Sequence, residues 1–569
     1  MKEPAFVMNY GCRFFNYFTD HFIMFQSYLK FFILWVLLEG GNFVYAQNKE
    51  DLSSLQKIVI PEPKLAIVNI TGISNMPTDK EYEQEAWFDY SDENFTFKKR
   101  ILIKAQGATS LAFPKKSFAV TFCDEDWSGD KTVDLRIGNW VKQDAFHFKA
   151  SWIDTFRGGL AVATAYKLYE DMVQDEPRFP ERAGLIDFNS KALCHPDCFP
   201  CVVYLNNEFQ GIFAWQLKKH RKNFDLDKNN QRQVLFGLTE NCFFFNSDTI
   251  QWKAIELKNP KVLDIESEEV LQQLVDYGAE LKVIIQHQDS ALIRNEINKR
   301  FDVSSIIDFI IHGLITANND GFVKNVHFFT YDGVKWFITP YDLDGTFGNN
   351  WLNQYQFPAD WTYLFSKYDM TGYISAEPYS WIKNYFFQEL TDRYITMRYT
   401  GVLSEQNIVP HLIDWNERVG EYYVQEHEKW SNAPSHSEYI INTPWENVDD
   451  WTDFFNIAEY SDTVTYEKDD LCSYGFRVWK AKAETKGVRP YCQCGYTDTI
   501  ERVASWLNRR LYLLDDYFGY DPMQMSFPQK LDFENKSMLN GKLIKNGTVY
   551  IRKNGKLYNI SGIVVRDSF

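Results

Sequence analysis

The chain has 569 residues, of which 45% are hydrophobic and 24% charged, a composition that excludes a disordered protein and suffices for more than one domain. Its formal net charge of −17 and the absence of a Lys/Arg-rich run exclude nucleic acid as an expected partner, because neutralising phosphates takes a basic face. Aromatic residues make up 17% of the chain, which favours a sheet-rich structure.

The N-terminal segment has the parts of a secretory signal. Lys30 precedes the apolar run FFILWVLL, and Val44-Tyr45-Ala46 resembles a signal-peptidase cleavage site with small residues. The run is shorter than the roughly 20 apolar residues that span a bilayer. We therefore expect residues 1–46 to be a signal peptide, with Met24 as an alternative start, and the mature protein to be exported to the periplasm, the cell surface or the medium.

Alternating strands and turns follow, and then segments with helical spacing. The expected strands are KLAIVNITG, RILIKAQG, KSFAVTF and AFHFKAS, within 57–150, and a hairpin at 201–217 that turns at Asn206-Asn207. The expected helices are 155–173, 265–298, 301–319, 376–398 and 404–431. Asp302 or Ser304 is suited to cap the 301–319 helix.

The stretch CHPDCFPC at 194–201 permits two interpretations. Cys194, His195, Cys198 and Cys201 resemble one half of a zinc site, but zinc sites take paired knuckles from two segments. In an exported protein the same residues are expected as disulfides or buried thiols.

A hairpin with acidic and amide residues at its ends follows the 301–319 helix. Asp332-Gly333 is a strong two-residue turn between VHFFT and KWFIT. With that turn Asn325 lies opposite Pro340, and Asp342 follows at the same open end. Asp320 lies in the loop before it. We expect these side chains to converge.

These side-chain types suit metal-assisted phosphoryl transfer. Asn325, Asp342 and Asp344 would offer oxygen ligands to Mg²⁺ or Mn²⁺, with phosphate oxygens completing the shell. Asp320 would accept the proton of an attacking hydroxyl. The alternative is that the acidic residues are solvated turn caps.

An upstream strand supplies a cation for the phosphates. In FPKKSFAVTF, Lys116 shares strand parity with Phe118, and Lys115 shares parity with Ser117 and Ala119, a small-residue face that could admit a nucleotide. Parity does not choose between the two lysines.

Five segments together resemble the CotH family, named for a spore-coat protein kinase. They are KAQGATSLAFPKKSFAV, WIDTFRGGLA, VVYLNNEFQGIF, NNDGFVKNVHFF and FITPYDLDGTFG, in the family's order. The resemblance implies an atypical protein-kinase-like fold that transfers the ATP γ-phosphoryl group to protein Ser/Thr. It implies Asp320 as catalytic residue, Asn325, Asp342 and Asp344 at the metal, and Lys115 or Lys116 at the phosphates, with Asp154 and Arg157 in a structural pair. Gln106 and Leu217 depart from the family, in place of its usual Arg and acidic residue, which leaves a degenerate kinase open.

Residues 447–497 form an aromatic block between two helices. The block resembles small chitin-binding modules, so Tyr460, Tyr466, Tyr474 and Trp479 are candidates for stacking on a polysaccharide. The alternative is that Tyr466 and Trp479 form the core of the block itself.

The expected architecture is α+β: a bilobal, atypical protein-kinase-like fold with a small inserted β-rich module and a C-terminal β tail. The expected parts are the signal peptide 1–46, a kinase domain 57–435, the module 447–497, a returning helix 498–520 and the tail 525–569. Two other functions stay open: a catalytically inactive surface or scaffold protein that binds glycans through the module, and a metal-dependent glycosyltransferase using Asp342-Leu343-Asp344. The second is disfavoured because no Rossmann-like run precedes it.

Overall fold

The structure is a computed structural model. It describes residues 49–107, 109–124, 126–127, 131–152, 159–175, 192–239, 249–318, 320–322, 324–349, 354–355, 359, 377–431, 433, 444–448, 457–474, 477–488, 492–493, 499–521, 541–545, 548–553, 556–559 and 564–565. The chain divides into two compact units, Met1–Glu50 and Asp51–Phe569, and almost all of the described residues belong to the second. The predicted signal peptide lies outside the described residues.

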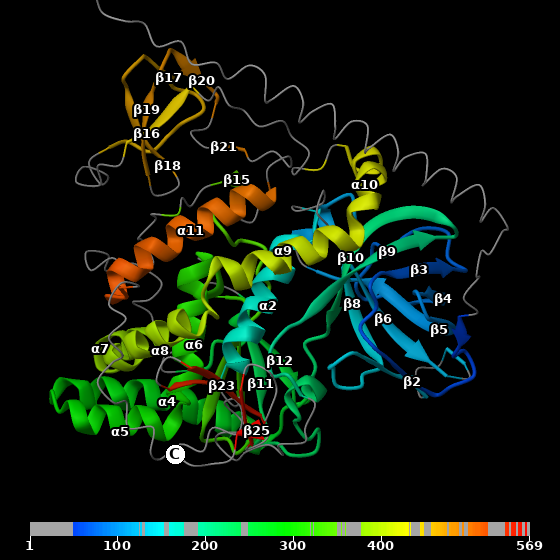
Figure 1. The fold of residues 1–569 in the computed structure, drawn as a ribbon, viewed down its shortest axis with the longest axis horizontal. Helices are drawn as coiled ribbons and strands as arrows, with labels where there is room; N and C mark the ends of the chain where they lie inside the picture. Colours follow the sequence, from blue (N-terminus) through cyan, green and yellow to red (C-terminus); the bar gives the residue numbers. More distant parts are fainter. Residues whose placement is uncertain are drawn as a thin grey trace, which may run out of the picture. The chain divides into compact units, whose positions relative to one another are not determined.

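Seven strands form a closed barrel near the start of the second unit. They are β3 (Ala66–Thr71), β4 (Gln84–Ser91), β5 (Phe95–Ala105), β6 (Phe118–Cys123), β8 (Ala145–Lys149), β9 (Cys198–Leu205) and β10 (Glu208–Leu217). Around the barrel the order is β5-β4-β3-β9-β10-β8-β6, and β6 pairs with β5 to close it (Figure 1). Within the barrel the β3–β9 pair is parallel and the other described pairs are antiparallel. Two short strands, β2 (Lys57–Ile60) and β7 (Asp134–Ile137), pair beside it, and β1 spans Glu50–Asp51.

The barrel corrects the expected fold class. The four strands expected between residues 57 and 150 are present as β3, β5, β6 and β8. The expected α+β architecture, a bilobal kinase-like fold, is wrong, because these strands do not form an open lobe but close on themselves through the 201–217 hairpin and the β5–β6 pairing. Strand β5 is long enough, at 11 residues, to pair with β4 along one edge and β6 along the other.

Aromatic side chains fill the barrel. Phe88, Phe118, Phe148 and Trp215 are each at most 1% exposed and share one hydrophobic cluster. Phe88 packs edge-on against Phe148 and Trp215, and the tilted rings of Phe148 and Trp215 have centroids 4.7 Å apart. Because successive residues of a strand face opposite sides, the intervening residues of β6 and β8 face outward. Ala119, His147 and Lys149 are among these outward residues.

A second sheet and a group of helices form the rest of the main body. The sheet has the order β12-β11-β13-β14, from β11 (Leu235–Leu238), β12 (Ile255–Asn259), β13 (Val326–Thr330) and β14 (Trp336–Pro340). The helices are α2 (Leu160–Gln174), α4 (Ile265–Gln286), α5 (Ser290–Arg300), α6 (Val303–Thr316), α7 (Tyr379–Tyr385), α8 (Phe387–Thr400), α9 (Glu405–Val419), α10 (Tyr423–Lys429) and α11 (Thr499–Phe518). No described helix is long and apolar enough to cross a membrane.

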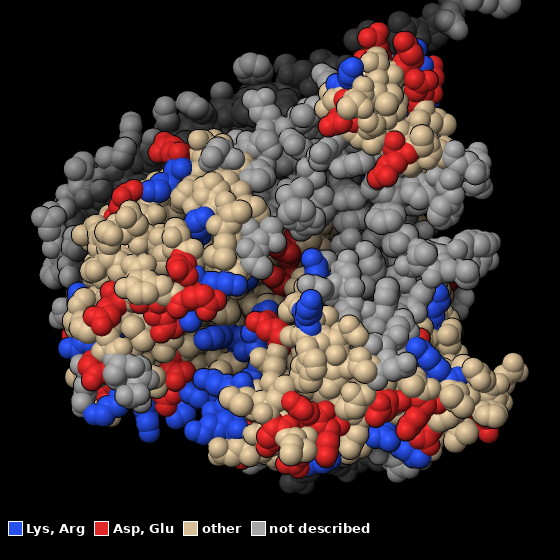
Figure 2. Space-filling model, turned by 180° about the vertical axis from the view of Figure 1, so that it is seen from behind, with Lys and Arg blue, Asp and Glu red and all other residues tan. Residues whose placement is uncertain are grey.

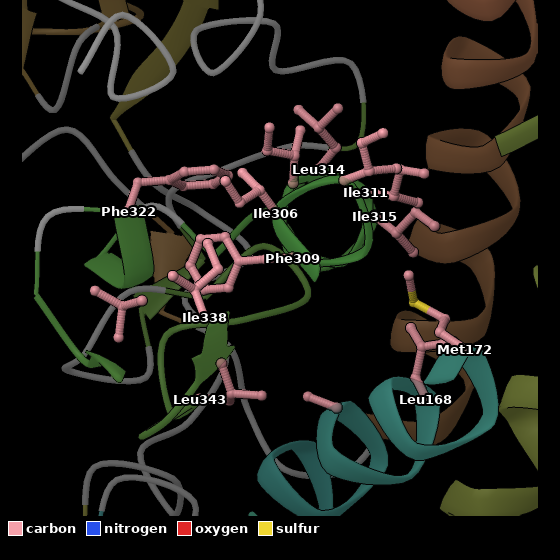
Figure 3. Packing of buried hydrophobic residues seen from close by; sticks show 14 of the residues in the cluster. Leu168, Met172, Ile306, Phe309, Ile311, Leu314, Ile315, Phe322, Ile338 and Leu343 are labelled. Carbon is pink, nitrogen blue, oxygen red and sulfur yellow. The ribbon is translucent and has the colours of Figure 1, made fainter. Parts of the chain in front are cut away.

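Helix α6 is the centre of the helical core. Asp302 caps it by accepting a hydrogen bond from Ser305 N at 2.8 Å, one of the two caps expected from the sequence. Its apolar side chains pack against α2, β14 and the segment after β14, as Ile306, Phe309 and Ile315 illustrate (Figure 3). The helix expected at 265–298 is divided into α4 and α5, because Asp289 starts a new helix by accepting from Ala291 N and Leu292 N.

The C-terminal end of α6 is held by a residue from late in the chain. Arg510 on α11 is fully buried and donates from Nε to Leu314 O at 2.8 Å and from Nη1 to Ala359 O at 3.1 Å. These bonds satisfy a carbonyl in the last turn of α6. Helix α11 is therefore part of the same core as α6, although the aromatic block separates them in sequence.

The aromatic block contains short strands around its own small core. They are β16 (Trp445–Val448), β17 (Thr465–Tyr466), β18 (Leu471–Tyr474), β19 (Arg477–Ala481) and β20 (Thr485–Lys486). Strand β15 (Gln354–Tyr355) pairs with β21 (Cys492–Gln493). Near the C-terminus β22 (Gly541–Lys545), β23 (Thr548–Lys553), β24 (Lys556–Asn559) and β25 (Val564–Val565) form an antiparallel sheet.

Candidate functional site

The predicted hairpin is β13 and β14. Val326 pairs with Pro340, and Tyr341 N donates to Asn325 O at 2.8 Å, so Asn325 lies opposite Tyr341 rather than Pro340. The expected register is wrong by one residue, because the connection runs from Tyr331 to Lys335 instead of two residues. Within it Asp332 Oδ1 accepts from Val334 N and Lys335 N, both at 2.8 Å. The change brings Asn325 nearer to Asp342.

Two residues at the open end of the hairpin have left-handed backbone conformations. Asn325 has φ 57° and Asp342 has φ 55°. Such conformations are uncommon outside glycine, are most tolerated by Asn and Asp, and concentrate at functional sites. Asn325 N is fixed to Leu238 O of β11 at 3.1 Å. The left-handed conformation therefore occurs at two of the three positions that the sequence assigned to a metal.

The segment after β14 alternates between buried and partly exposed residues. Tyr341 and Leu343 are 3% and 0% exposed, whereas Asp342 and Asp344 are partly exposed. Figure 3 shows Leu343 inside the core shared with α2 and α6. Anchoring Leu343 there leaves the two carboxylates outside that core.

Asp320 begins the short 3-10 helix Asp320–Phe322 that follows α6. Asn318, before it, is 2% exposed and accepts from Gly321 N at 3.1 Å, which fixes this turn. Phe322 packs against Phe309 and Tyr379. The backbone at 320–322 is therefore anchored to α6, while the atoms of the Asp320 side chain lie outside the described part.

The ammonium group beside Asp342 belongs to Lys149, a residue that no sequence motif indicated. Lys149 Nζ lies 3.8 Å from Asp342 Oδ1, and the two side chains are 18% and 37% exposed. Lys149 ends β8, two residues after His147 and on the same outward face. The ion pair joins the barrel to the hairpin.

Lys115 forms a different, closed ion pair. Its Nζ donates to Glu426 Oε1 at 2.7 Å and to Ile212 O at 2.6 Å, and both side chains are at most 1% exposed. Glu426 Oε2 in turn accepts from Ile212 N at 2.8 Å. Gly211, with φ 127°, leaves room for the pair, since a Cβ there would lie 2.4 Å from Glu426 Oε2. The pair fastens α10 to β10.

The remaining residues named from the resemblance differ in burial and hydrogen bonding, and two of them lie outside the described residues. Lys116 Nζ donates to Leu111 O at 2.6 Å. Leu217 is 1% exposed and belongs to the barrel core, and Gln106 Oε1 is buried without a hydrogen-bond partner among the described residues. Asp154 and Arg157 lie outside the described residues.

Further lysines gather near Lys149. We define the lysine cluster as Lys104 on β5, Lys149 on β8, Lys218 and Lys219 after β10, and Lys258 on β12. Burial lowers the pKa of Lys218, and Lys104 and Lys258 lower it further. Burial also lowers the pKa of Lys219, against the opposing effects of Glu256 and Asp342, and its Nζ lies 4.0 Å from the Tyr341 ring centroid.

Two buried histidines adjoin this cluster and are held neutral. Burial, followed by the charges of Lys149, Lys218, Lys219 and Lys258, puts the pKa of His147 well below its usual value. The pKa of His327, on β13, is likewise lowered well below its usual value by burial, with Lys219 and Lys258 adding to the effect. Lysine charges thus act on both histidines in addition to burial. Figure 2 shows that Lys and Arg side chains lie beside Asp and Glu side chains on one face of the molecule.

The oxygen atoms at the open end of the hairpin are of the chemical type that binds a hard divalent cation. Asn325, Asp342 and Asp344 offer amide and carboxylate oxygens, which Mg²⁺ and Mn²⁺ prefer, with few protein ligands and several water or phosphate oxygens. Among the described side chains no group of three or more His, Cys, Asp or Glu residues forms a metal site.

Comparison with protein families decides where the chain belongs. A family model described as CotH kinase protein matches residues 103–465, more than half of the chain. The chain is a member of the CotH kinase family. No curated protein matches it.

The CotH match covers the barrel from within β5 onward, both ion pairs and the whole hairpin, and its limits differ from the expected domain 57–435. Membership indicates a kinase-like enzyme. The carbohydrate-binding resemblance of 447–497 has no such match behind it.

Within this CotH chain the cysteine stretch does not gather around a metal. Cys194, Cys198 and Cys201 are buried, and they belong to three different hydrophobic clusters. His195 Nδ1 lies 2.9 Å from Pro196 O. The burial of all three cysteines is compatible with the expectation of disulfides or buried thiols.

The aromatic residues of the block largely face each other. Tyr466 and Trp479 are 6% and 8% exposed and share a core with Trp445 and Cys472, against which Tyr460 packs. The Tyr466 and Trp445 ring centroids are 5.1 Å apart. The structure thus supports the module-core alternative for Tyr466 and Trp479, while the side chain of Tyr474 lies outside the described part.

Proposed function

We propose that this CotH-family protein is an exported kinase that transfers the γ-phosphoryl group of ATP to Ser or Thr hydroxyls of surface or secreted proteins. Family membership supports the kinase-like chemistry. The observation that carries the site assignment is the juxtaposition of Lys149 and Asp342, 3.8 Å apart, at the open end of the β13–β14 hairpin. A cation and a carboxylate there suit a phosphate and its counter-ion.

The residues have the following roles in the proposal. Asn325, Asp342 and Asp344 would hold a Mg²⁺ or Mn²⁺ ion, which, when bound, neutralises developing charge on the β- and γ-phosphates. Asp320 would accept the proton of the attacking hydroxyl while the hydroxyl oxygen bonds to the γ-phosphorus and the bridging oxygen leaves with ADP.

Lys115 and Lys116 remain the sequence-based candidates for a phosphate contact. In protein kinases a lysine held by a glutamate contacts the nucleotide phosphates. Lys115 and Glu426 have this pairing, but the Lys115 side chain is only 1% exposed. A phosphate contact by Lys115 would require its ammonium group to become accessible, because it is almost fully buried.

Transfer from labelled ATP to a mixture of exported proteins, or to the protein itself, tests the proposal in the presence of Mg²⁺ or Mn²⁺. Asp342→Asn and Asp320→Asn are each expected to lower incorporation by about a thousandfold or more, the scale seen for groups that act in the transition state. Asp332→Asn is the matched control, since it makes the same change at the other end of the hairpin and keeps the turn acceptor. Undiminished incorporation by Asp342→Asn would sink the assignment.

Export is part of the proposal and is supported by the sequence alone. Expression of the full chain followed by N-terminal sequencing of the exported product should show cleavage near Ala46. Retention of the intact N-terminus inside the cell would contradict it.

A further inference from the structure

A short motif that recurs in the chain has the sequence of a glycan acceptor. Asn-x-Ser/Thr, with any residue except proline in the middle, is the acceptor sequence for N-linked glycans in exported proteins. The motif starts at Asn69, Asn94, Asn535, Asn546 and Asn559. The structure describes the side chains of the first two, and both belong to the barrel. Their surroundings can therefore be compared directly.

Asn94 lies in the turn that joins β4 to β5, one residue before β5 begins, and it is exposed. Its side chain makes no hydrogen bond or ion pair with any residue that the structure describes. Thr96, the third residue of the motif, is partly exposed and shares the outward face of β5 with the exposed Lys98. Both polar side chains that define the motif are therefore at the surface.

The turn is held in place without the Asn94 side chain. Asp92 Oδ1 accepts hydrogen bonds from Asn94 N and Phe95 N, both at 2.6 Å, and Asp92 Oδ2 accepts from Tyr90 OH at 2.5 Å. Asp92 N donates to Phe95 O at 3.0 Å. The turn thus depends on the Asp92 carboxylate and on backbone groups. A glycan on Asn94 Nδ2 would break none of these bonds.

Asn69 has the opposite surroundings, although it begins the same motif. It lies on β3, which pairs with β4 on one side and β9 on the other. Its Nδ2 donates to Asn207 Oδ1 at 2.7 Å, and its Oδ1 accepts from Asn207 N at 3.0 Å. A sugar on Asn69 Nδ2 would meet the turn formed by Asn206 and Asn207. The fold thus favours Asn94 over Asn69 as a glycan acceptor.

We propose that Asn94 is the acceptor of an N-linked glycan. In the transfer, Asn94 Nδ2 forms a bond to the anomeric carbon of the first sugar of a lipid-pyrophosphate-linked oligosaccharide. The bond from that carbon to the pyrophosphate oxygen breaks, the lipid pyrophosphate leaves with the electron pair, and the amide loses one proton to a base of the glycan transferase. The proposal rests on export, which is one part of the proposed function, and not on phosphoryl transfer.

A glycan at Asn94 would lie far along the barrel from the candidate site. Lys104, near the other end of β5, aligns with Ala119, and Ala119 aligns with His147 beside the lysine cluster. The ten residues from Asn94 to Lys104 span about 33 Å when extended as a strand. The glycan and the candidate site therefore do not compete for space.

Peptide mapping by mass spectrometry of the exported protein, purified from the organism that makes it, tests the proposal. Fragmentation should place the mass of a glycan on Asn94 and leave Asn69 unmodified. Asn94→Gln and Thr96→Ala, expressed in the same organism, should each abolish the modification. Thr96→Ser is the matched control and should retain it, because the motif accepts either hydroxyl residue. Circular dichroism confirms that each variant is folded.

The outcomes separate this proposal from the kinase proposal. A glycan on Asn94 that is lost in Thr96→Ala supports the site, even where labelled ATP gives no phosphoryl transfer. A chain with a cleaved N-terminus and an unmodified Asn94 overturns the glycan site and leaves the kinase proposal standing, as does a glycan on Asn69 in place of Asn94. An intact N-terminus with an unmodified Asn94 overturns both export and the glycan site. Asn94→Gln should keep the wild-type rate of phosphoryl transfer.

Discussion

Two places on the barrel hold lysine ammonium groups, and they differ in burial and in what accepts their hydrogen bonds. Lys115 is enclosed by Glu426 and Ile212 O, so the chain supplies its acceptors. Lys149 and Lys218, about the same barrel, lack such acceptors in the described part. The comparison teaches that a lysine from a conspicuous Lys-Lys pair can have a structural role, while lysines from separate strands can lie close together although no sequence motif indicates it.

The largest expected effect is on the free energy of unfolding when the buried Lys115–Glu426 ion pair is broken. Lys115→Met or Glu426→Leu alone should lower the free energy of unfolding by about 3–5 kcal/mol, because each leaves one buried charge without its partner. The double variant should recover most of that loss, since no charge is then buried. Urea denaturation of the four proteins measures the coupling.

The exposed pair Lys98–Asp89, with N–O distance 2.8 Å and side chains 50% and 33% exposed, is the control for that cycle. Lys98→Met should change stability by less than about 1 kcal/mol. Equal losses of unfolding free energy for Lys115→Met and Lys98→Met would show that the buried pair does not hold α10 against the barrel.

A smaller effect concerns pH near the lysine cluster. Burial lowers the pKa of His220 to about 4 from a usual value near 6.5. Between these values the unfolded chain binds a proton that the folded chain does not, so stability is lost as the pH falls from about 6.5 to about 4, by about 1.4 kcal/mol per pH unit.

His220→Asn should remove this part of the pH dependence. The His220 side chain accepts from Lys222 N at the start of the 3-10 helix Arg221–Phe224, and Asn keeps an acceptor there. Urea midpoints at pH 6.5 and 5 for both proteins measure the difference. An identical pH dependence in the variant would mean that His220 titrates normally in the folded protein.

The smallest expected change in stability is that of replacing Lys218, and it distinguishes this lysine from the buried Lys115. Lys218→Gln should leave stability unchanged or raise it by up to about 1 kcal/mol at low salt, because it removes repulsion from Lys104 and Lys258 without breaking an ion pair. Thermal unfolding at low and high salt measures it, and the gain should vanish at high salt. A loss comparable to that of Lys115→Met would place Lys218 among the structural residues and break the comparison.

The sequence predicted local structure well where the signal is local. The capping role of Asp302, the helical spacing of 301–319 and the alternation of KSFAVTF and AFHFKAS depend on neighbouring residues, and each is present. Barrel closure depends on β5 pairing with β6 and on β3 pairing with β9, contacts that no local pattern specifies. The expected bilobal fold was wrong for this reason.

The candidate site was predicted in part. Asn325 and Asp342 are at one end of a hairpin as expected, although its loop is longer than an Asp-Gly turn requires. Lys149 was missed because its partner lies far along the chain. The run Lys218-Lys219-His220 did indicate a local concentration of basic side chains after a strand, in a chain that is acidic overall. Only the preceding residue, Leu217, was considered, as a departure from the family pattern.

The hydrogen bonds from Arg510 to Leu314 O and Ala359 O have a consequence for folding during translation. Helix α6 leaves the ribosome long before α11, and the aromatic block is translated between them. The nascent protein must therefore hold an incomplete core until α11 emerges, and a product truncated before Thr499 would expose that core to chaperones and proteases.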